Sequence, residues 1–197
     1  MEKITPKSVL AELRKFSGTD DEPKLLWITP HTEELWLASP FFMVKPNPIT
    51  RVVLDELWDE CNLAYAAMTF TAGLAIRGWA NRKVPDIDKL FPDFFDLSPI
   101  EPSPLPGIAA LLYRGPGGVP VEMWRREDGV WSTVNADFAD FVRRHSDACA
   151  WRQGATDKAI VGIDKYGEAC ALLAPLNAAD NDALVRDPDL PQRLFDF

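Results

Sequence analysis

Histidine and cysteine are scarce in this chain, which contains two histidines and three cysteines among its 197 residues. Cys61, Cys149 and Cys170 lie far apart in the sequence, so neither a metal motif nor a disulfide framework is expected. His31 stands near two glutamates, and a single histidine with carboxylates on a loop is a weak signal for a metal ion. We therefore predict no metal site, no cofactor and no catalytic residues.

Basic residues are in the minority, since 30 acidic residues face 21 basic ones and the formal net charge is −9. Nucleic acids and anionic membranes are themselves negative, so this charge disfavours both as partners. It favours a basic protein partner. Solubility alone explains a charge of this size equally well.

Long apolar runs are missing too. The longest uncharged stretch, residues 61–76, is shorter than the ~20 residues that a membrane-spanning helix needs. Residues 1–6 contain no apolar core of a signal peptide. Each cysteine lies beside apolar or alanine-rich sequence, which is typical of buried free thiols in a reducing compartment. We therefore expect a cytoplasmic protein.

Apolar and aromatic residues are plentiful. Hydrophobic residues make up 47% of the chain, including seven Trp and eleven Phe, which is enough for one substantial core. We predict a single domain over residues 1–197. The proline-rich connector at 98–107 is the best candidate for an internal boundary, because prolines exclude a regular helix and a central strand there.

Helical spacing of apolar residues marks several elements. The longest predicted helix has Asn47 as its N-cap and Pro48 in its first turn, followed by an apolar stripe at spacings of three and four. We predict helices from Thr5 to Gly18, from Asn47 to about Thr69 or Gly73, over 86–95, and from Asn135.

Strand signals fill the remaining sequence, with tight turns such as Glu127-Asp128-Gly129 between them. We predict strands at 25–29, 35–44, 108–114, 119–126, 130–134, 159–164 and 168–173. The predicted fold class is α+β, an antiparallel sheet with a β meander, packed against two or more amphipathic helices.

Acidic residues line the predicted Asn47 helix opposite its apolar stripe. Like charges at i,i+4 each cost a few tenths of a kcal/mol. A solvated face accounts for this pattern, and so does a docking surface for a cationic partner. A second acidic group after residue 85 would extend that surface. The predicted partner-binding residues are Asp55, Glu56, Asp59, Glu60, Asp86 and Asp88.

Two local motifs invite a catalytic interpretation. His145-Ser146-Asp147 has the residue types of a catalytic triad, but neighbours on a helix point in different directions. We predict a polar helix end there. Gly115-Pro116-Gly117-Gly118 lacks the Lys-Ser/Thr of a phosphate loop, so we predict a hairpin turn.

Residues 108–145 resemble the closing part of the SUKH superfamily, in which a β meander with glycine-rich turns leads into a final helix. The matching segments are Gly115-Pro116-Gly117-Gly118, Val121-Glu122-Met123-Trp124 and the helix Asn135-Ala136-Asp137-Phe138-Ala139-Asp140-Phe141-Val142. The superfamily includes bacterial immunity proteins that neutralise secreted toxins. The resemblance implies a cytoplasmic protein that binds a toxin without chemistry. The family's usual leucine-proline and asparagine-glycine-glycine segment is missing, and residues 1–84 have no counterpart.

These observations favour a non-catalytic immunity or inhibitor protein that occludes a basic toxin or effector through an acidic surface. One alternative is an accessory chaperone or adaptor for a secreted cargo protein. Another is a hydrolase that uses a pair of carboxylates, because such pairs leave no local motif.

Overall fold

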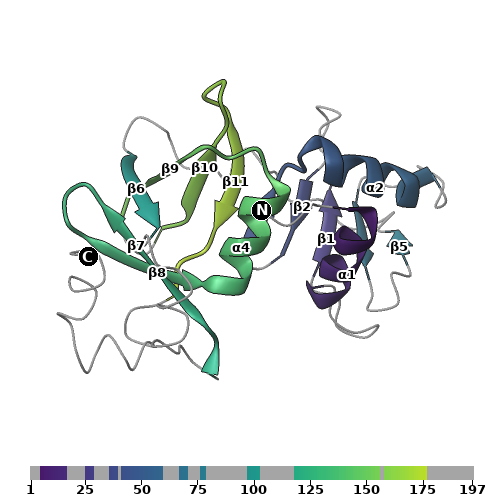
Figure 1. Cartoon of the computed structure of the whole chain (residues 1–197), viewed down its shortest axis with the longest axis horizontal. Coiled ribbons are helices and arrows are strands. Elements are labelled where there is room, and N and C mark those ends of the chain that lie inside the picture. The colour runs from purple at the N-terminus through teal and green to yellow at the C-terminus, as the bar shows by residue number, and fades with distance from the viewer. Residues whose placement is uncertain are drawn as a thin grey trace. The chain divides into compact units, whose positions relative to one another are not determined.

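A computed structural model of the chain describes residues 5–16, 25–28, 36–39, 41–59, 67–70, 76–78, 97–102, 118–155 and 158–176. The chain divides into two compact units (Figure 1). One unit contains Met1–Phe91 with His145–Asp147, and the other contains Pro92–Arg144 with Ala148–Phe197. That these units form a single domain stays a prediction.

In the residues that the structure describes, the first unit is an antiparallel sheet with the helices α1 and α2. Its strands lie in the order β5-β4-β1-β2-β3. Buried apolar side chains of β2 and β3, among them Leu37 and Val44, form part of its core. The elements are α1 (Pro6–Phe16), β1 (Leu25–Ile28), β2 (Trp36–Ala38), β3 (Phe42–Val44), α2 (Pro48–Asp59), β4 (Ala67–Phe70) and β5 (Ile76–Gly78).

Both helices begin with a side-chain cap, which confirms the cap predicted at Asn47. The Thr5 hydroxyl accepts a hydrogen bond from the Ser8 backbone N–H at 3.2 Å. The Asn47 side-chain oxygen accepts one from the Thr50 backbone N–H at 3.0 Å. Each cap satisfies one of the backbone donors that the first turn leaves without a helical partner.

The predicted end of the Asn47 helix is wrong, because α2 ends at Asp59 and residues 67–70 form β4. β4 pairs with β1 on one side and with β5 on the other. Short apolar runs fit a buried helix and a buried strand equally well. Pairing with β1 and β5 gives these residues backbone hydrogen-bond partners on both sides, so the strand is the outcome.

The run at 35–44 is also corrected, from one strand to two. β2 and β3 pair with each other in an antiparallel manner. Between them the Ser39 N–H donates to the Phe42 carbonyl at 2.8 Å, and the Ser39 hydroxyl accepts from the Phe41 and Phe42 N–H groups. The serine thus closes a turn that its local hydrogen bonds favour.

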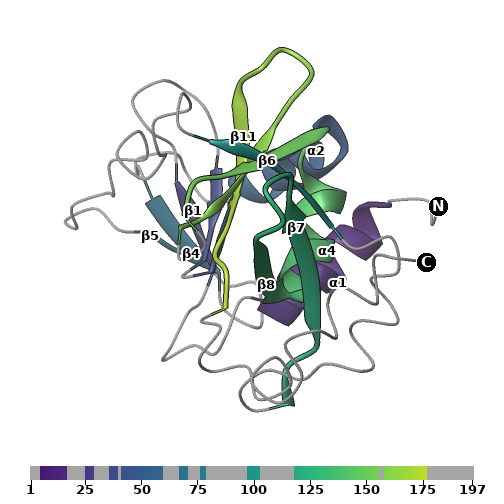
Figure 2. The same cartoon turned by 90° about the vertical axis from the view of Figure 1, so that its left-hand side faces the viewer.

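In its described residues, the second unit is a sheet in the order β11-β10-β9-β6-β7-β8 with the helix α4. Figure 2 shows the helix, α4, beside β7 and β8. The largest fully buried side chains of this unit are Trp124, Phe141 and Ile100. The elements are β6 (Ser98–Pro102), β7 (Val121–Arg126), β8 (Trp131–Asn135), α4 (Ala136–His145), β9 (Ala150–Gln153), β10 (Ile160–Ile163) and β11 (Ala169–Leu173). The last residue of α4, His145, is counted with the first unit.

Two predicted hairpins and the predicted helix of this unit are confirmed. β7 pairs with β8 across a turn at Gly129, and β10 pairs with β11 across a turn at Gly167. Both glycines have positive φ, 82° and 85°, which glycine adopts without steric cost. The Asn135 side chain accepts a hydrogen bond from the Asp137 N–H at 2.9 Å and caps α4.

The prediction that prolines keep the connector out of a central strand is wrong. Its first part is β6, which is paired on both sides. β6 pairs with β9 at Ser98 and Pro99, and with β7 from Ile100 to Pro102. The two ladders are therefore staggered along β6. A proline lacks an N–H but still fits a strand wherever its partner needs only a carbonyl. Consistent with this, the Pro99 carbonyl accepts from the Glu127 N–H.

The predicted α+β fold class, an antiparallel sheet packed against amphipathic helices, is wrong. Antiparallel strands dominate the part of the chain that the structure describes, and α1, α2 and α4 have only 11, 12 and 10 residues. The long helix that would have made a second layer stops at Asp59, and its continuation joins a sheet. The predicted helix at 86–95 and strand at 108–114 lie outside the described residues.

Candidate functional site

The predicted partner-binding residues fall into two groups. Residues 55, 56 and 59 belong to α2, where the structure describes the backbone but not these side chains. Glu60, Asp86 and Asp88 lie outside the described residues. Three of the six predicted residues therefore lie on a single helix, and for these three only the backbone position is described.

The first turn of α2 shows which side of the helix faces outward. Ile49 and Val52 are 48% and 56% exposed, whereas Thr50 and Val53 are 0% and 2% exposed. Helical neighbours recur at intervals of three and four residues. Positions 55, 56 and 59 follow Val52 by three, four and seven, so they share its side of the helix. Ile49, Val52 and positions 55, 56 and 59 are called the α2 outer face.

Sequence reasoning missed the two apolar members of this face. A signal was present, because Ile49 and Val52 lie outside the apolar stripe that begins at Leu54. Exposed apolar side chains scattered singly are ordinary on protein surfaces. Ile49 and Val52 lie on adjacent turns, on the side of α2 where positions 55, 56 and 59 also fall.

His145 does not form a triad with its sequence neighbours. Its Nδ1 atom lies 2.8 Å from the Thr50 hydroxyl, and its Nε2 atom lies 2.6 Å from a Glu12 carboxylate oxygen. A hydroxyl, an imidazole and a carboxylate in a hydrogen-bonded row is the arrangement of a nucleophile with its base and orienting acid. The three residues come from distant parts of the sequence, so no local motif could reveal them.

Burial excludes this row from catalysis. Thr50 is 0% exposed and His145 is 1% exposed, so no substrate can reach the hydroxyl. The Thr50 N–H is not available to stabilise an oxyanion, because it already donates to the Asn47 side chain. The Asn47 N–H in turn donates to the His145 carbonyl at 2.7 Å. The row therefore joins α1, the start of α2 and His145 structurally.

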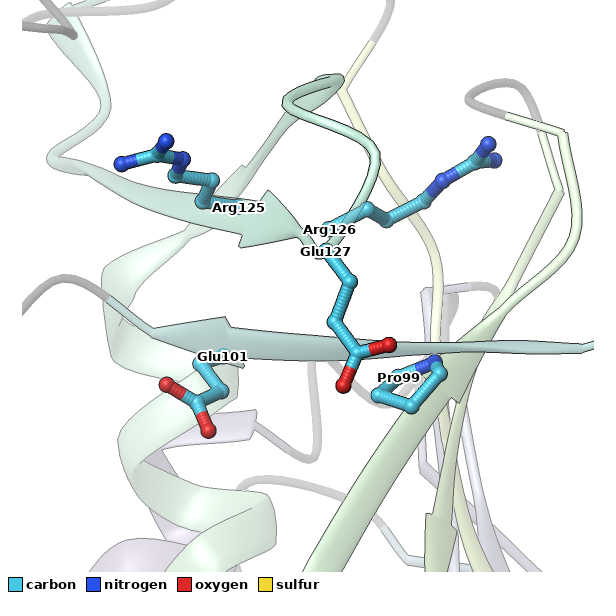
Figure 3. A pocket seen from close by; sticks show the side chains of 5 residues that line it. All are labelled: Pro99, Glu101, Arg125, Arg126 and Glu127. Carbon is cyan, nitrogen blue, oxygen red and sulfur yellow. The ribbon is translucent and has the colours of Figure 1, made fainter.

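The second unit carries a shallow hollow with charged walls (Figure 3). Its volume is about 270 Å³, and its lining residues come from β6, β7 and the turn that follows β7. The carboxylates of Glu101 and Glu127 are exposed. An acid catalyst would need one carboxyl group in apolar surroundings, which neither residue has. The lining residues are Pro99, Glu101, Arg125, Arg126 and Glu127.

The two arginines of the hollow are engaged elsewhere. Arg126 forms an ion pair with Asp128 and donates to the Gly154 carbonyl. The guanidinium of Arg125 lies over the ring of Trp131, 5.6 Å from its centroid. The hydrogen bond from Arg126, helped by the Val130 N–H, holds the pKa of Asp128 below its ordinary value of 3.8.

Potential metal ligands are dispersed in the part of the chain that can be described. No group of three or more His, Cys, Asp or Glu side chains comes together there. Cys149 is an exposed free thiol and Cys170 a buried one, while Cys61 lies outside the described residues. Among the helices that are described, none has the length and apolar character to cross a membrane.

Comparison with known proteins identifies no family. No protein-family model matches the chain, and no curated protein is similar to it. Among solved structures, it is similar to the β subunit of DNA polymerase III from Thermotoga maritima, with 12% sequence identity and a TM-score of 0.43. The match covers 88% of this chain and 64% of that one, so this chain spans less than two thirds of the subunit.

Proposed function

We propose that this chain is a non-catalytic binding protein of the immunity or inhibitor type, acting in the cytoplasm. It occludes a basic partner protein, a toxin or effector, through the α2 outer face. The observation that carries the proposal is the exposure of Ile49 and Val52 on the side of α2 that holds the acidic positions. The resemblance of residues 108–145 to SUKH proteins supports the immunity type. The free thiols Cys149 and Cys170 support a reducing compartment such as the cytoplasm.

The chemistry of this face suits a partner with both apolar and cationic groups. Protein interfaces have an apolar centre with a polar rim. Full burial of an aliphatic side chain contributes about 1.5–3 kcal/mol, so covering the half-exposed Ile49 and Val52 contributes roughly half as much for each. Acidic positions beside them would attract lysine and arginine side chains, which speeds association and selects the partner.

A capture experiment with matched variants tests this proposal. The full chain is used to retain proteins from a lysate of its native host, and the retained proteins are quantified by mass spectrometry. Asp55→Lys with Asp59→Lys reverses charge on the α2 outer face, and Val52→Ser removes an apolar contact. Glu168→Lys with Asp147→Lys changes the net charge by the same amount at exposed residues outside that face.

We expect a basic protein to be retained by the native chain and by the Glu168 and Asp147 variant. The α2 charge-reversal variant should retain it at least ~10-fold less, because like charges then face each other. Val52→Ser should weaken retention by a few fold. Equal retention by all variants would rule out the α2 outer face. Retention of an acidic or neutral protein alone would contradict the predicted chemistry of the partner.

A further inference from the structure

The sheet of the second unit joins its two ends through one residue. Its strand order runs from β11 to β8, and Leu176, which follows shortly after the end of β11, bridges back to Thr133 on β8. The Leu176 N–H donates to the Thr133 carbonyl at 2.7 Å. In the described part of the chain this antiparallel bridge is isolated, because Ala174 and Pro175 belong to no strand. The ring of strands is therefore closed by a single point of pairing.

The bridge occupies the outer edge of β8. Among the described strands, β8 pairs only with β7, along Trp131–Asn135. The N–H and C=O groups of one strand residue point to the same side, so both groups of Thr133 point outward, whereas Ser132 and Val134 bond toward β7. Tryptophan, threonine and valine favour extended backbone, and a strand edge of this kind pairs readily with another strand. Leu176 thus covers the centre of an edge that is suited to strand addition.

The Thr133 hydroxyl has no hydrogen-bond partner in this closed arrangement. Thr133 is 3% exposed, and its Oγ1 atom is buried and unpaired. Residues directly opposite each other in an antiparallel pair have their side chains on the same face, so the Leu176 side chain lies beside this hydroxyl. A leucine side chain offers no donor or acceptor, and an unpaired buried hydroxyl destabilises the closed state. A strand with a hydroxyl at this position would fit the edge better.

We propose that Leu176 is a releasable latch, and that the β8 edge it covers pairs with β8 of a second copy of this chain once the latch opens. Antiparallel pairing about a two-fold axis at Thr133 places Thr133 opposite its own counterpart and Trp131 opposite Asn135. The outward backbone groups of the two Thr133 residues then bond reciprocally, and the two hydroxyls can bond to each other. The edge belongs to the second unit, so its test does not depend on the proposed function.

Analytical ultracentrifugation of matched variants of the full chain tests this inference. Leu176→Pro removes the side chain and the N–H that donates to Thr133, whereas Leu176→Ala shortens the side chain and keeps the N–H. Leu176→Pro with Thr133→Val also removes the hydroxyl but keeps a β-branched residue, which suits a strand. Circular dichroism establishes whether each variant keeps its sheet. Hydrogen exchange of the native chain, followed by nuclear magnetic resonance, is a second measurement that needs no variant.

We expect Leu176→Pro to dimerise with a dissociation constant about 10-fold lower than that of the native chain, because the hydrogen bond that closes the latch is lost. Leu176→Ala should differ less from the native chain. Thr133→Val should weaken the Leu176→Pro dimer about five-fold. In the native chain, the Leu176 amide should exchange faster than the amides of Ser132 and Val134, since the latch opens locally. A higher protein concentration should slow exchange of the Thr133 amide.

Four results would each overturn the inference. The first is a folded Leu176→Pro variant that dimerises no more than the native chain, and the second is equal dimerisation of Leu176→Ala. The third is a dimer that Thr133→Val leaves unchanged. The fourth is a native Leu176 amide that exchanges only together with those of Ser132 and Val134, and this result decides the matter if Leu176→Pro does not fold.

Discussion

Gly162 shows how one residue without a side chain determines the packing of its neighbours. It pairs with Trp151 on β9 and with Ala171 on β11, so it lies between two strands. A Cβ atom at this position would lie 2.8 Å from the Trp151 ring and 2.9 Å from the Cβ atoms of Ala148 and Ala171. The glycine therefore leaves room for the indole, which packs edge-on against Trp124 at 5.2 Å between centroids.

Replacing this glycine should destabilise the second unit. In Gly162→Ala the new methyl group meets the Cβ atoms of Ala148 and Ala171, which can move only with their backbone, so we expect a loss of about 1–3 kcal/mol. Thermal unfolding followed by tryptophan fluorescence measures the change. Ala150→Ser, an exposed change on β9, should alter stability by less than about 0.5 kcal/mol. A Gly162→Ala variant as stable as the native chain would show that the sheet relaxes around the methyl group.

Elements are joined in the second unit by an ion pair between α4 and β7 whose carboxylate is buried. Glu122 is 1% exposed, and its two carboxylate oxygens accept hydrogen bonds from Arg143 at 2.5 and 2.8 Å. The same guanidinium lies 5.9 Å from the centroid of the Trp124 ring. Glu122 and Trp124 are two residues apart on β7, so both point to the same side of that strand. Arg143 thus binds α4 to that side by charge and by contact with the indole.

Removal of one partner should cost much more than removal of both. Arg143→Met leaves a carboxylate buried without a counter-ion, so we expect a loss of roughly 3 kcal/mol in chemical denaturation. Glu122→Leu with Arg143→Met should recover most of it, since an apolar pair of similar size is often as stable as a buried ion pair.

The exposed pair of Arg144 with Asp140 on the same helix provides the control. Arg144→Met should cost less than about 1 kcal/mol, because surface ion pairs contribute little. Equal effects of Arg143→Met and Arg144→Met would contradict the importance of the buried pair.

Element boundaries were predicted correctly from the sequence where a local interaction sets them. Asn47 and Asn135 cap their helices, and Gly129 and Gly167 close their hairpins, because side-chain caps and positive φ act within a few residues. β4 and β6 could not be predicted in this way. Their neighbours β1, β5, β7 and β9 decide them by pairing, and a pattern of apolar residues or prolines does not encode those partners.

At the scale of the whole molecule, the net charge of −9 should raise the rate of association with a basic partner. Attraction between opposite charges falls as salt shortens the Debye length, from about 30 Å at 0.01 M to about 8 Å at 0.15 M. We expect the association rate constant with the captured partner to fall about 10-fold over this range. Surface plasmon resonance measures it.

The dissociation rate of that complex should depend less on salt, since apolar contacts at Ile49 and Val52 are not screened. The Asp55→Lys with Asp59→Lys variant should show a flatter dependence of the association rate on salt. Association that is equally fast at both salt concentrations would contradict an electrostatic role for the acidic surface.

Part of the candidate surfaces was predictable from the sequence and part was not. The acidic positions 55, 56 and 59 were recognised from their spacing, because a helical period is a local property. The exposure of Ile49 and Val52 was not, since burial depends on what packs against the helix. The hollow at Glu101 and Glu127 depends on the pairing of two strands that a glycine-rich segment separates in the chain.

The sequence by itself determined the scarcity of reactive side chains, the excess of acid, the helix caps and the hairpin turns. Each follows from composition or from interactions within a few residues. Only the tertiary structure decided that residues 67–70 and 98–102 are strands, that Thr50, His145 and Glu12 meet, and that Glu101 and Glu127 share a hollow. These outcomes depend on backbone pairing and burial between segments distant in the chain. The free energy gained by that pairing outweighs the local conformational preference of each segment.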